Sequence, residues 1–329
     1  MKRVLVLGAG GFVGRRLVES LAETGWAQPI AALHRTPARF GPGVATVRLD
    51  VTEPMALTRA LGAAEFVVNC VAGDARTIAT GARRLFESAA TLDTIERVVH
   101  LSSMAVYGSA TGRVQETVPP VGDLGWYGDA KVQAEERARA YTRAGGRVVV
   151  LRPGCIYGPE SDPWTGRIGR WLRAGRLGDL GASGDGTCNL VFVDDVVAAV
   201  IAALQEPAAE GHAINLATPA GTWNRYFVRF ARAIGSTPVR RISGRRLRVE
   251  TTVLAPVLKA AGIAARRLRA GGLGLPEPIP PSLVRLWQQD IELDSTKAGE
   301  LLRIPWTPID RGLERAARWF TGAAPRPGG

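Results

Sequence analysis

The chain has 329 residues, of which 46% are hydrophobic and 22% charged, as in a globular protein with one large domain or two unequal ones. Its net charge is +12, and region 240–269 contributes +8 of this, with nine basic residues and one acid. That region has no aromatic side chain to stack on bases, so we expect no binding to nucleic acid.

Cysteines and histidines are few and widely spaced. Cys70, Cys155 and Cys188 form no CxxC pair and the three histidines stand alone, so we expect neither a disulfide framework nor a metal site. The apolar run after Met1 is too short for a secretory signal, and no stretch approaches the ~20 apolar residues of a membrane span. We therefore expect a cytoplasmic protein.

Short apolar runs alternate with longer amphipathic ones through the first half of the chain. The short runs predict strands at Arg3–Leu7, Ile30–Leu33, Thr46–Leu49, Phe66–Cys70, Arg97–Leu101 and Val148–Arg152, with a further candidate at Ala213–Leu216. The amphipathic runs predict helices at Gly14–Thr24, Thr77–Ala90 and Tyr127–Ala144. This alternation is typical of an α/β fold, a Rossmann-like doubly wound parallel sheet.

After Gly158 the pattern loosens into a stretch rich in Gly, Pro, Trp and Arg, and a further helix is predicted at Val196–Leu204. We expect a cofactor-binding domain at 1–158, to which 188–218 returns. A smaller, mostly helical substrate-binding part is expected at 159–187 and 219–320. Residues 321–329 are expected to form a flexible tail.

A glycine-rich turn follows the first predicted strand directly. In Gly8-Ala-Gly-Gly11-Phe12-Val13-Gly14, the glycines allow a tight turn and let the backbone approach a pyrophosphate at the start of a helix. In this strand–turn–helix context the motif predicts a dinucleotide site formed by Gly8, Gly11, Phe12, Val13 and Gly14.

The end of the second predicted strand bears on the choice between NAD and NADP. NAD enzymes usually place an acid there to hold the adenine ribose hydroxyls, whereas a basic residue suits the extra phosphate of NADP. This chain has Leu33-His34-Arg35 with Arg39 beyond. The sequence therefore favours NADP, with NAD as the alternative.

Tyr127 and Lys131 lie four residues apart, on one face of a predicted helix. A nearby ammonium group and an oxidised nicotinamide would favour the phenolate, which makes a tyrosine an acid–base catalyst near neutral pH. The chain has only four lysines, which favours a specific role for this one. The alternative is a surface helix that carries both residues by chance.

These motifs together resemble the extended short-chain dehydrogenase/reductase family, also called the NAD-dependent epimerase/dehydratase family, from Met1 to about Phe320. GxxGxxG and YxxxK are joined by Ser103, four residues before a VYG tyrosine. The resemblance further implies cofactor contacts at Asp50 and Val51, at Val71 and Ala72, and at Pro153.

By that resemblance, Tyr127 would exchange a proton with a substrate oxygen while Ser103 hydrogen-bonds the same oxygen. Lys131 would bind the nicotinamide ribose and lower the pKa of Tyr127. The resemblance also implies a small-molecule substrate and a homodimer.

Several positions depart from the family pattern. Ile78 stands where an asparagine is common, and Met104 and Ala105 replace the Asp-Glu pair of dehydratases. Cys155 and Cys188 replace an asparagine and an arginine that serve the diphosphate in sugar-nucleotide epimerases. We therefore expect an oxidoreductase acting on a secondary alcohol or ketone. The alternatives are a sugar-nucleotide epimerase and a non-catalytic NADP-binding protein used for assembly or sensing.

Region 240–269 is both basic and amphipathic, with apolar residues at helical spacing from Val253 onward. We expect a substrate-domain helix that exposes its arginine face to water. The alternative is a weak contact with an anionic surface or a partner.

Overall fold

The computed structural model describes residues 1–258, 260 and 277–322. The chain divides into two compact units. Unit 1 comprises Met1–Ile156, Val191–Thr218 and Leu293–Thr307. Unit 2 comprises Tyr157–Leu190, Pro219–Glu292 and Pro308–Gly329. The assignment of cofactor and substrate binding to separate domains stays a prediction, and most of the expected tail lies outside the described residues.

Unit 1 is built on a seven-stranded sheet in which every neighbouring pair of strands is parallel. Its order is β10-β7-β5-β4-β1-β2-β3. The strands are β1 (Lys2–Leu7), β2 (Ala27–Leu33), β3 (Ala45–Arg48), β4 (Phe66–Asn69), β5 (Arg97–Leu101), β7 (Val148–Pro153) and β10 (Ala213–Leu216). The Rossmann-like sheet is therefore confirmed, including the seventh strand.

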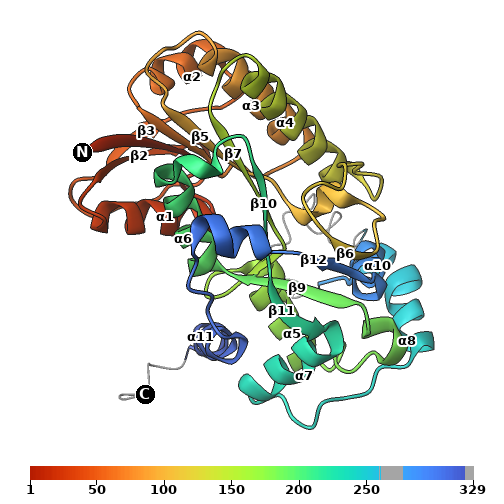
Figure 1. The fold of residues 1–329 in the computed structure, drawn as a ribbon. Helices are drawn as coiled ribbons and strands as arrows, with labels where there is room; N and C mark the ends of the chain where they lie inside the picture. The colour runs from red at the N-terminus through yellow and green to blue at the C-terminus, as the bar shows by residue number, and fades with distance from the viewer. Residues whose placement is uncertain (259, 261–276, 323–329) are drawn as a thin grey trace. The chain divides into compact units, whose positions relative to one another are not determined.

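Both faces of this sheet are covered by helices, as the nearly continuous apolar strands require. Val4 and Val6 of β1 point into one core with α1 and α6, whereas Leu5 and Leu7 point into the opposite core with α2, α3 and α4. Figure 1 shows α1 and α6 on one side of the sheet and α2, α3 and α4 on the other. The helices are α1 (Phe12–Glu23), α2 (Pro54–Leu61), α3 (Ala75–Ala89), α4 (Trp126–Arg143) and α6 (Val193–Gln205).

Unit 2 is mostly helical and has an aromatic core. Phe227 packs edge-on against Trp287 at a ring separation of 5.2 Å, and Trp171 and Trp223 are likewise fully buried. Its helices are α5 (Arg167–Arg173), α7 (Trp223–Ala233), α8 (Gly244–Val249), α10 (Pro281–Gln288) and α11 (Ile309–Thr321). The short strands of the chain are β6 (Gly112–Val114), β8 (Cys155–Tyr157), β9 (Thr187–Phe192), β11 (Thr218–Thr222) and β12 (Ile291–Leu293). Within the described ranges, no helix has both the length and the apolar character needed to cross a bilayer.

Candidate active site

The glycine turn joins the carboxyl end of β1 to the start of α1, and steric contacts explain its glycines. Gly8 has a φ of +77°, and a Cβ there would lie 2.9 Å from the carbonyl oxygen of Cys70. A Cβ on Gly14 would lie 2.4 Å from the carbonyl oxygen of Gly8. Gly10, which the motif leaves variable, is equally constrained, because its Cβ would lie 2.8 Å from Thr36 O. The turn therefore excludes side chains and keeps its backbone accessible.

The start of α1 is suited to a phosphate. Its N-cap is Gly11, which supplies no side-chain acceptor, and the first turn holds no acidic residue. The N–H groups of the first turn have no intrahelical acceptors, and the helix dipole favours an anion. Phe12 and Val13 are half-buried beside this end. These residues fit the pyrophosphate of a dinucleotide.

At the end of β2, His34 and Arg35 are exposed. The fold brings Asp50 to them, with 3.4 Å between His34 Nε2 and Asp50 Oδ2. Thr52 donates two hydrogen bonds to Asp50 Oδ1, of 2.9 Å from its N and 2.8 Å from its Oγ1. These bonds, opposed by desolvation and aided by His34 and Arg35, hold the pKa of Asp50 below its ordinary value. Asp50, which is distant in the sequence, thus lies beside the basic residues His34 and Arg35.

The other predicted cofactor contacts differ in accessibility. Val51 is buried in the core against Gly81, so Asp50 is the member of that pair with an accessible side chain. Val71 is half-buried and Ala72 exposed just beyond β4. Pro153 is buried and ends β7.

Asn69, which the sequence analysis missed, fixes the loop after β4. Its Oδ1 accepts from Val71 N at 3.1 Å, so its amide nitrogen faces His100 Nδ1 at 3.0 Å. His100 therefore carries its proton on Nε2, an atom without a hydrogen-bond partner in the described structure. Burial, with a smaller contribution from the charge of Lys131, lowers the pKa of His100 to about 3.

Ser103 and Tyr127 meet at the carboxyl edge of the sheet. Ser103 follows β5 and caps the short helix η1 (Met104–Tyr107), its Oγ accepting from Ala105 N at 3.2 Å. The same side chain lies close enough to the Tyr127 phenol to lower its pKa. Tyr127 lies in the first turn of α4 and is 38% exposed. The phenol is therefore accessible beside Ser103.

Lys131 lies one turn further along α4 and is only 4% exposed. Its Nζ donates to Leu101 O at 2.7 Å, at the last residue of β5. Burial lowers the pKa of this amine to about 8, while Cys70 and Glu135 act in the opposite direction. The α4 face thus places Tyr127 and Lys131 together at the end of β5, as their spacing predicts.

The pKa of Tyr127 lies above its ordinary value in the protein without cofactor. Desolvation is the main effect and raises this pKa, although part of the residue is exposed. The Ser103 side chain lowers that pKa, and Cys155 raises it. The effect of Lys131 on the phenol, which was expected together with an oxidised nicotinamide, stays a prediction.

A buried ion pair lies on the same face of α4, four residues beyond Lys131. Glu135 accepts from Arg152 Nε at 2.9 Å and Nη2 at 2.7 Å, and from Ser102 Oγ at 2.6 Å. Arg152 Nη1 donates to Tyr107 OH at 2.8 Å. Sequence reasoning singled out Arg152 only as the residue before Pro153 and missed Glu135, whose i+8 spacing from Tyr127 was the available signal.

Four of the five departures from the family pattern lie at buried positions, and Ala105 is half-buried. Ile78 is 3% exposed in the core of α3, and Met104 is 8% exposed. Cys155 and Cys188 are both buried, and burial raises the pKa of the Cys155 thiol. A neutral thiol is a poor donor for a diphosphate.

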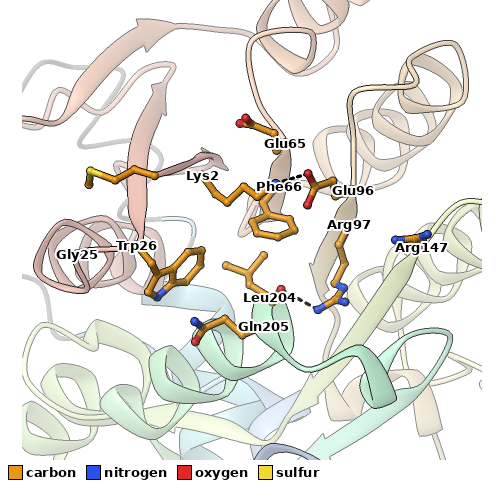
Figure 2. Close-up of a pocket in the computed structure, with 11 residues that line it drawn as sticks. Lys2, Gly25, Trp26, Glu65, Phe66, Glu96, Arg97, Arg147, Leu204 and Gln205 are labelled. Atoms are coloured by element: carbon orange, nitrogen blue, oxygen red, sulfur yellow. Dashed lines mark hydrogen bonds and ion pairs between the residues drawn. The ribbon is translucent and has the colours of Figure 1, made fainter.

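A separate hollow of about 650 Å³ lies at the opposite edge of the sheet, where β1, β4 and β5 begin. Figure 2 shows Trp26, Phe66 and Leu204 lining it, with Lys2 paired to Glu96. Arg97 Nη1 donates to Leu204 O at 2.7 Å. Because Gly8, Ser103 and Tyr127 belong to the other edge, this hollow is not the reaction site.

Solved structures support the fold. The UDP-glucose 4-epimerase of Thermotoga maritima superposes with a TM-score of 0.74 over 97% of this chain and 98% of that one, at 20% identity. The UDP-glucuronic acid 4-epimerase of Bacillus cereus, solved with NAD, gives a TM-score of 0.74 over 97% and 96%, at 18% identity.

Sequence relatives and a family model place the chain more closely. The 2'-dehydrokanamycin reductase of Streptomyces kanamyceticus is 31% identical over 71% of this chain and 67% of the relative. The 2-alkyl-3-oxoalkanoate reductase of Stenotrophomonas maltophilia is 28% identical over 60% and 63%. The model of the NAD dependent epimerase/dehydratase family matches residues 4–217. The chain therefore belongs to the NAD dependent epimerase/dehydratase family and is an NAD-dependent oxidoreductase or epimerase.

Proposed function

We propose that this protein is an NADP-preferring oxidoreductase that acts on a secondary alcohol or ketone of a small molecule, with Tyr127 as the acid and base. The observation that carries the proposal is the grouping of Ser103, Tyr127 and Lys131 at the carboxyl end of β5, with Ser103 after that strand and the other two one turn apart on α4. The two relatives described above are named as reductases.

The protein groups divide the reaction between them. A bound nicotinamide supplies or accepts the hydride at the reacting carbon. In the reducing direction Tyr127 donates its phenolic proton to the carbonyl oxygen, and the resulting alcohol leaves. Ser103 holds that oxygen by a hydrogen bond and stabilises the negative charge that develops on it. Lys131 would bind the cofactor ribose.

Two other outcomes of the same chemistry are less well supported. Met104 and Ala105 offer no acid for loss of water, which argues against dehydration. Cys155 and Cys188 offer no charged donor for a diphosphate, which argues against a sugar-nucleotide epimerase. An epimerase would also return the hydride to its own substrate, so nicotinamide absorbance would show no net change.

The catalytic proposal is tested by following NADPH absorbance with a panel of small ketones. We expect Tyr127→Phe to lower the rate by at least ~100-fold while NADPH still raises the melting temperature. Full activity of Tyr127→Phe on a substrate of the natural chain would refute the role of Tyr127. Racemisation of a chiral alcohol without net absorbance change would favour the epimerase. Binding of NADPH with no turnover of any ketone or alcohol would favour a non-catalytic role.

The preference for NADP rests on Arg35 and His34 at the end of β2 and is opposed by Asp50 beside them. We expect Arg35→Asp to weaken NADPH binding by about tenfold and leave NADH binding nearly unchanged. Arg59→Asp, an equal charge change on exposed α2, is the matched control. Tighter binding of NADH than of NADPH by the natural chain would overturn the preference.

The cytoplasmic location and the homodimer also remain predictions. Size-exclusion chromatography with light scattering measures the molar mass in solution and therefore the oligomeric state. We expect twice the 35.0 kDa mass of one chain.

A further inference from the structure

A helical stretch of unit 2 presents one row of residues to the protein and another to the surroundings. It runs through α8 and the following turns Glu250–Leu254, and continues to residue 258. Leu247, Thr251 and Ala255 are buried, at 3%, 6% and 6% exposure. Glu250 is also buried, where it accepts from Arg176 Nε at 2.9 Å. These residues recur every three or four positions and form the inner row.

The outer row is apolar. Val249, Val253 and Val257 follow one another at intervals of four and are 58%, 58% and 59% exposed. Leu254 beside them is 38% exposed. We call these four residues the valine ridge. The arginines of this segment are exposed as expected, and apolar side chains at helical spacing share the outward side with them.

Arginines precede the valine ridge in the sequence. Residues 240–258 hold five arginines and one acid, a net charge of +4, and that acid is the buried Glu250. Arg245 lies one helical turn before Val249 in the same row, and Arg248 is adjacent to it in sequence. Both arginines are exposed. The ridge is thus an apolar row with exposed arginines at its amino-terminal end.

We propose that the valine ridge and its arginines dock the protein on an anionic lipid bilayer. A bilayer surface combines the two chemistries that this segment displays, negative headgroups for arginine and hydrocarbon for valine. A nucleic acid would satisfy the charge alone and offers no hydrocarbon to a row of valines. The attachment is shallow and reversible, because the ridge has only four apolar side chains. This inference is independent of the reaction proposed above.

The experiment measures sedimentation of the full chain with vesicles of phosphatidylcholine alone or mixed with phosphatidylglycerol in equal parts. We expect binding only to the anionic vesicles, lost when salt rises from ~0.1 M to ~1 M, where the screening length falls from ~10 Å to ~3 Å. The variant Arg245→Gln/Arg248→Gln should bind about 30-fold more weakly, at roughly fivefold for each basic residue lost.

Two further variants separate lipid docking from general attraction to polyanions. Val253→Asn/Val257→Asn keeps every charge and should weaken binding at least about tenfold. Arg137→Gln/Arg143→Gln removes the same charge from exposed positions of α4 and should bind like the natural chain. Thermal melts establish that each variant is folded.

Three results would overturn the proposal. The first is that the natural chain does not bind anionic vesicles at low salt. The second is that Val253→Asn/Val257→Asn binds them as tightly as the natural chain. The third is that Arg137→Gln/Arg143→Gln loses as much vesicle binding as Arg245→Gln/Arg248→Gln. Unchanged binding by the valine variant, with tight binding to a single-stranded oligonucleotide, would assign the surface to nucleic acid instead.

Discussion

The buried pair of Glu135 and Arg152 offers the sharpest test of the site's supporting structure. Glu135 is 2% exposed and Arg152 is 3% exposed, and two hydrogen bonds join their side chains. Glu135→Gln keeps the size of the side chain and its contact with Ser102 but removes the negative charge. The guanidinium of Arg152 then stays in the interior without a countercharge.

The expected loss is large because the remaining charge is not solvated. Breaking a buried pair by removing one partner destabilises a protein by ~3–5 kcal/mol. Arg152→Met should cost a similar amount, since it leaves the buried carboxylate of Glu135 with only the exposed Arg139, whose Nη2 lies 3.9 Å from Oε2. The double variant Glu135→Gln/Arg152→Met removes both charges, so we expect it to lose at least ~2 kcal/mol less than the sum of the single losses.

Urea unfolding followed by circular dichroism measures these free energies. If the two units unfold in separate steps, the step of unit 1 is the one that NADPH shifts. Glu96→Gln is the control, because its pair with Lys2 is exposed, at 46% and 42% for the two side chains, and should contribute at most ~1 kcal/mol. The reasoning fails if Glu135→Gln costs no more than Glu96→Gln, or if the two single losses simply add.

Three further predictions concern the glycine turn and the buried side chains of Lys131 and His100. Gly14→Ala should weaken NADPH binding at least ~tenfold by calorimetry, because its Cβ would lie 2.4 Å from Gly8 O, whereas Gly41→Ala, with open space around it, should bind normally. The pKa of Lys131 falls from 10.5 to about 8 on folding, so the unfolded chain binds more protons between these values. The stability of the natural chain relative to Lys131→Met should therefore rise between pH 8 and pH 10.5, and a flat difference would contradict the burial argument. The pKa of His100 falls from 6.5 to about 3, so protonation favours the unfolded chain, and stability is lost as pH falls through this range. At pH ~4 the natural chain should have lost ~3 kcal/mol more than His100→Gln, as measured by urea titrations at each pH.

Local patterns were sufficient where the fold depends on neighbouring residues. Most strands of the sheet are apolar runs buried on both faces, whereas the edge strand β3 is largely exposed. Each strand was predicted within a few residues of its observed ends. The turn at Gly8 was predictable because the glycines that its steric contacts require lie close together in the sequence. Tyr127 and Lys131 were predictable because helical spacing alone puts them on one face.

Contacts between segments that are distant in the sequence could not be predicted from local patterns. Asp50 meets His34 only because β3 lies beside β2, and Glu135 meets Arg152 only because α4 packs against β7. The orientation of the valine ridge depends on which row of the helix finds partners in unit 2. A periodic pattern gives the rows of a helix but does not say which row faces inward.

The charges of the site favour one direction of the proposed reaction. Desolvation keeps the pKa of Tyr127 above its ordinary value of 10.0 in the protein without cofactor. At neutral pH the phenol is therefore protonated, which is the form that donates a proton to a carbonyl oxygen. Oxidation of an alcohol needs the phenolate as a base, and the charge to stabilise it would have to come with an oxidised nicotinamide. The arrangement thus favours reduction, and the rate of ketone reduction should stay constant across neutral pH and fall only as the phenol ionises.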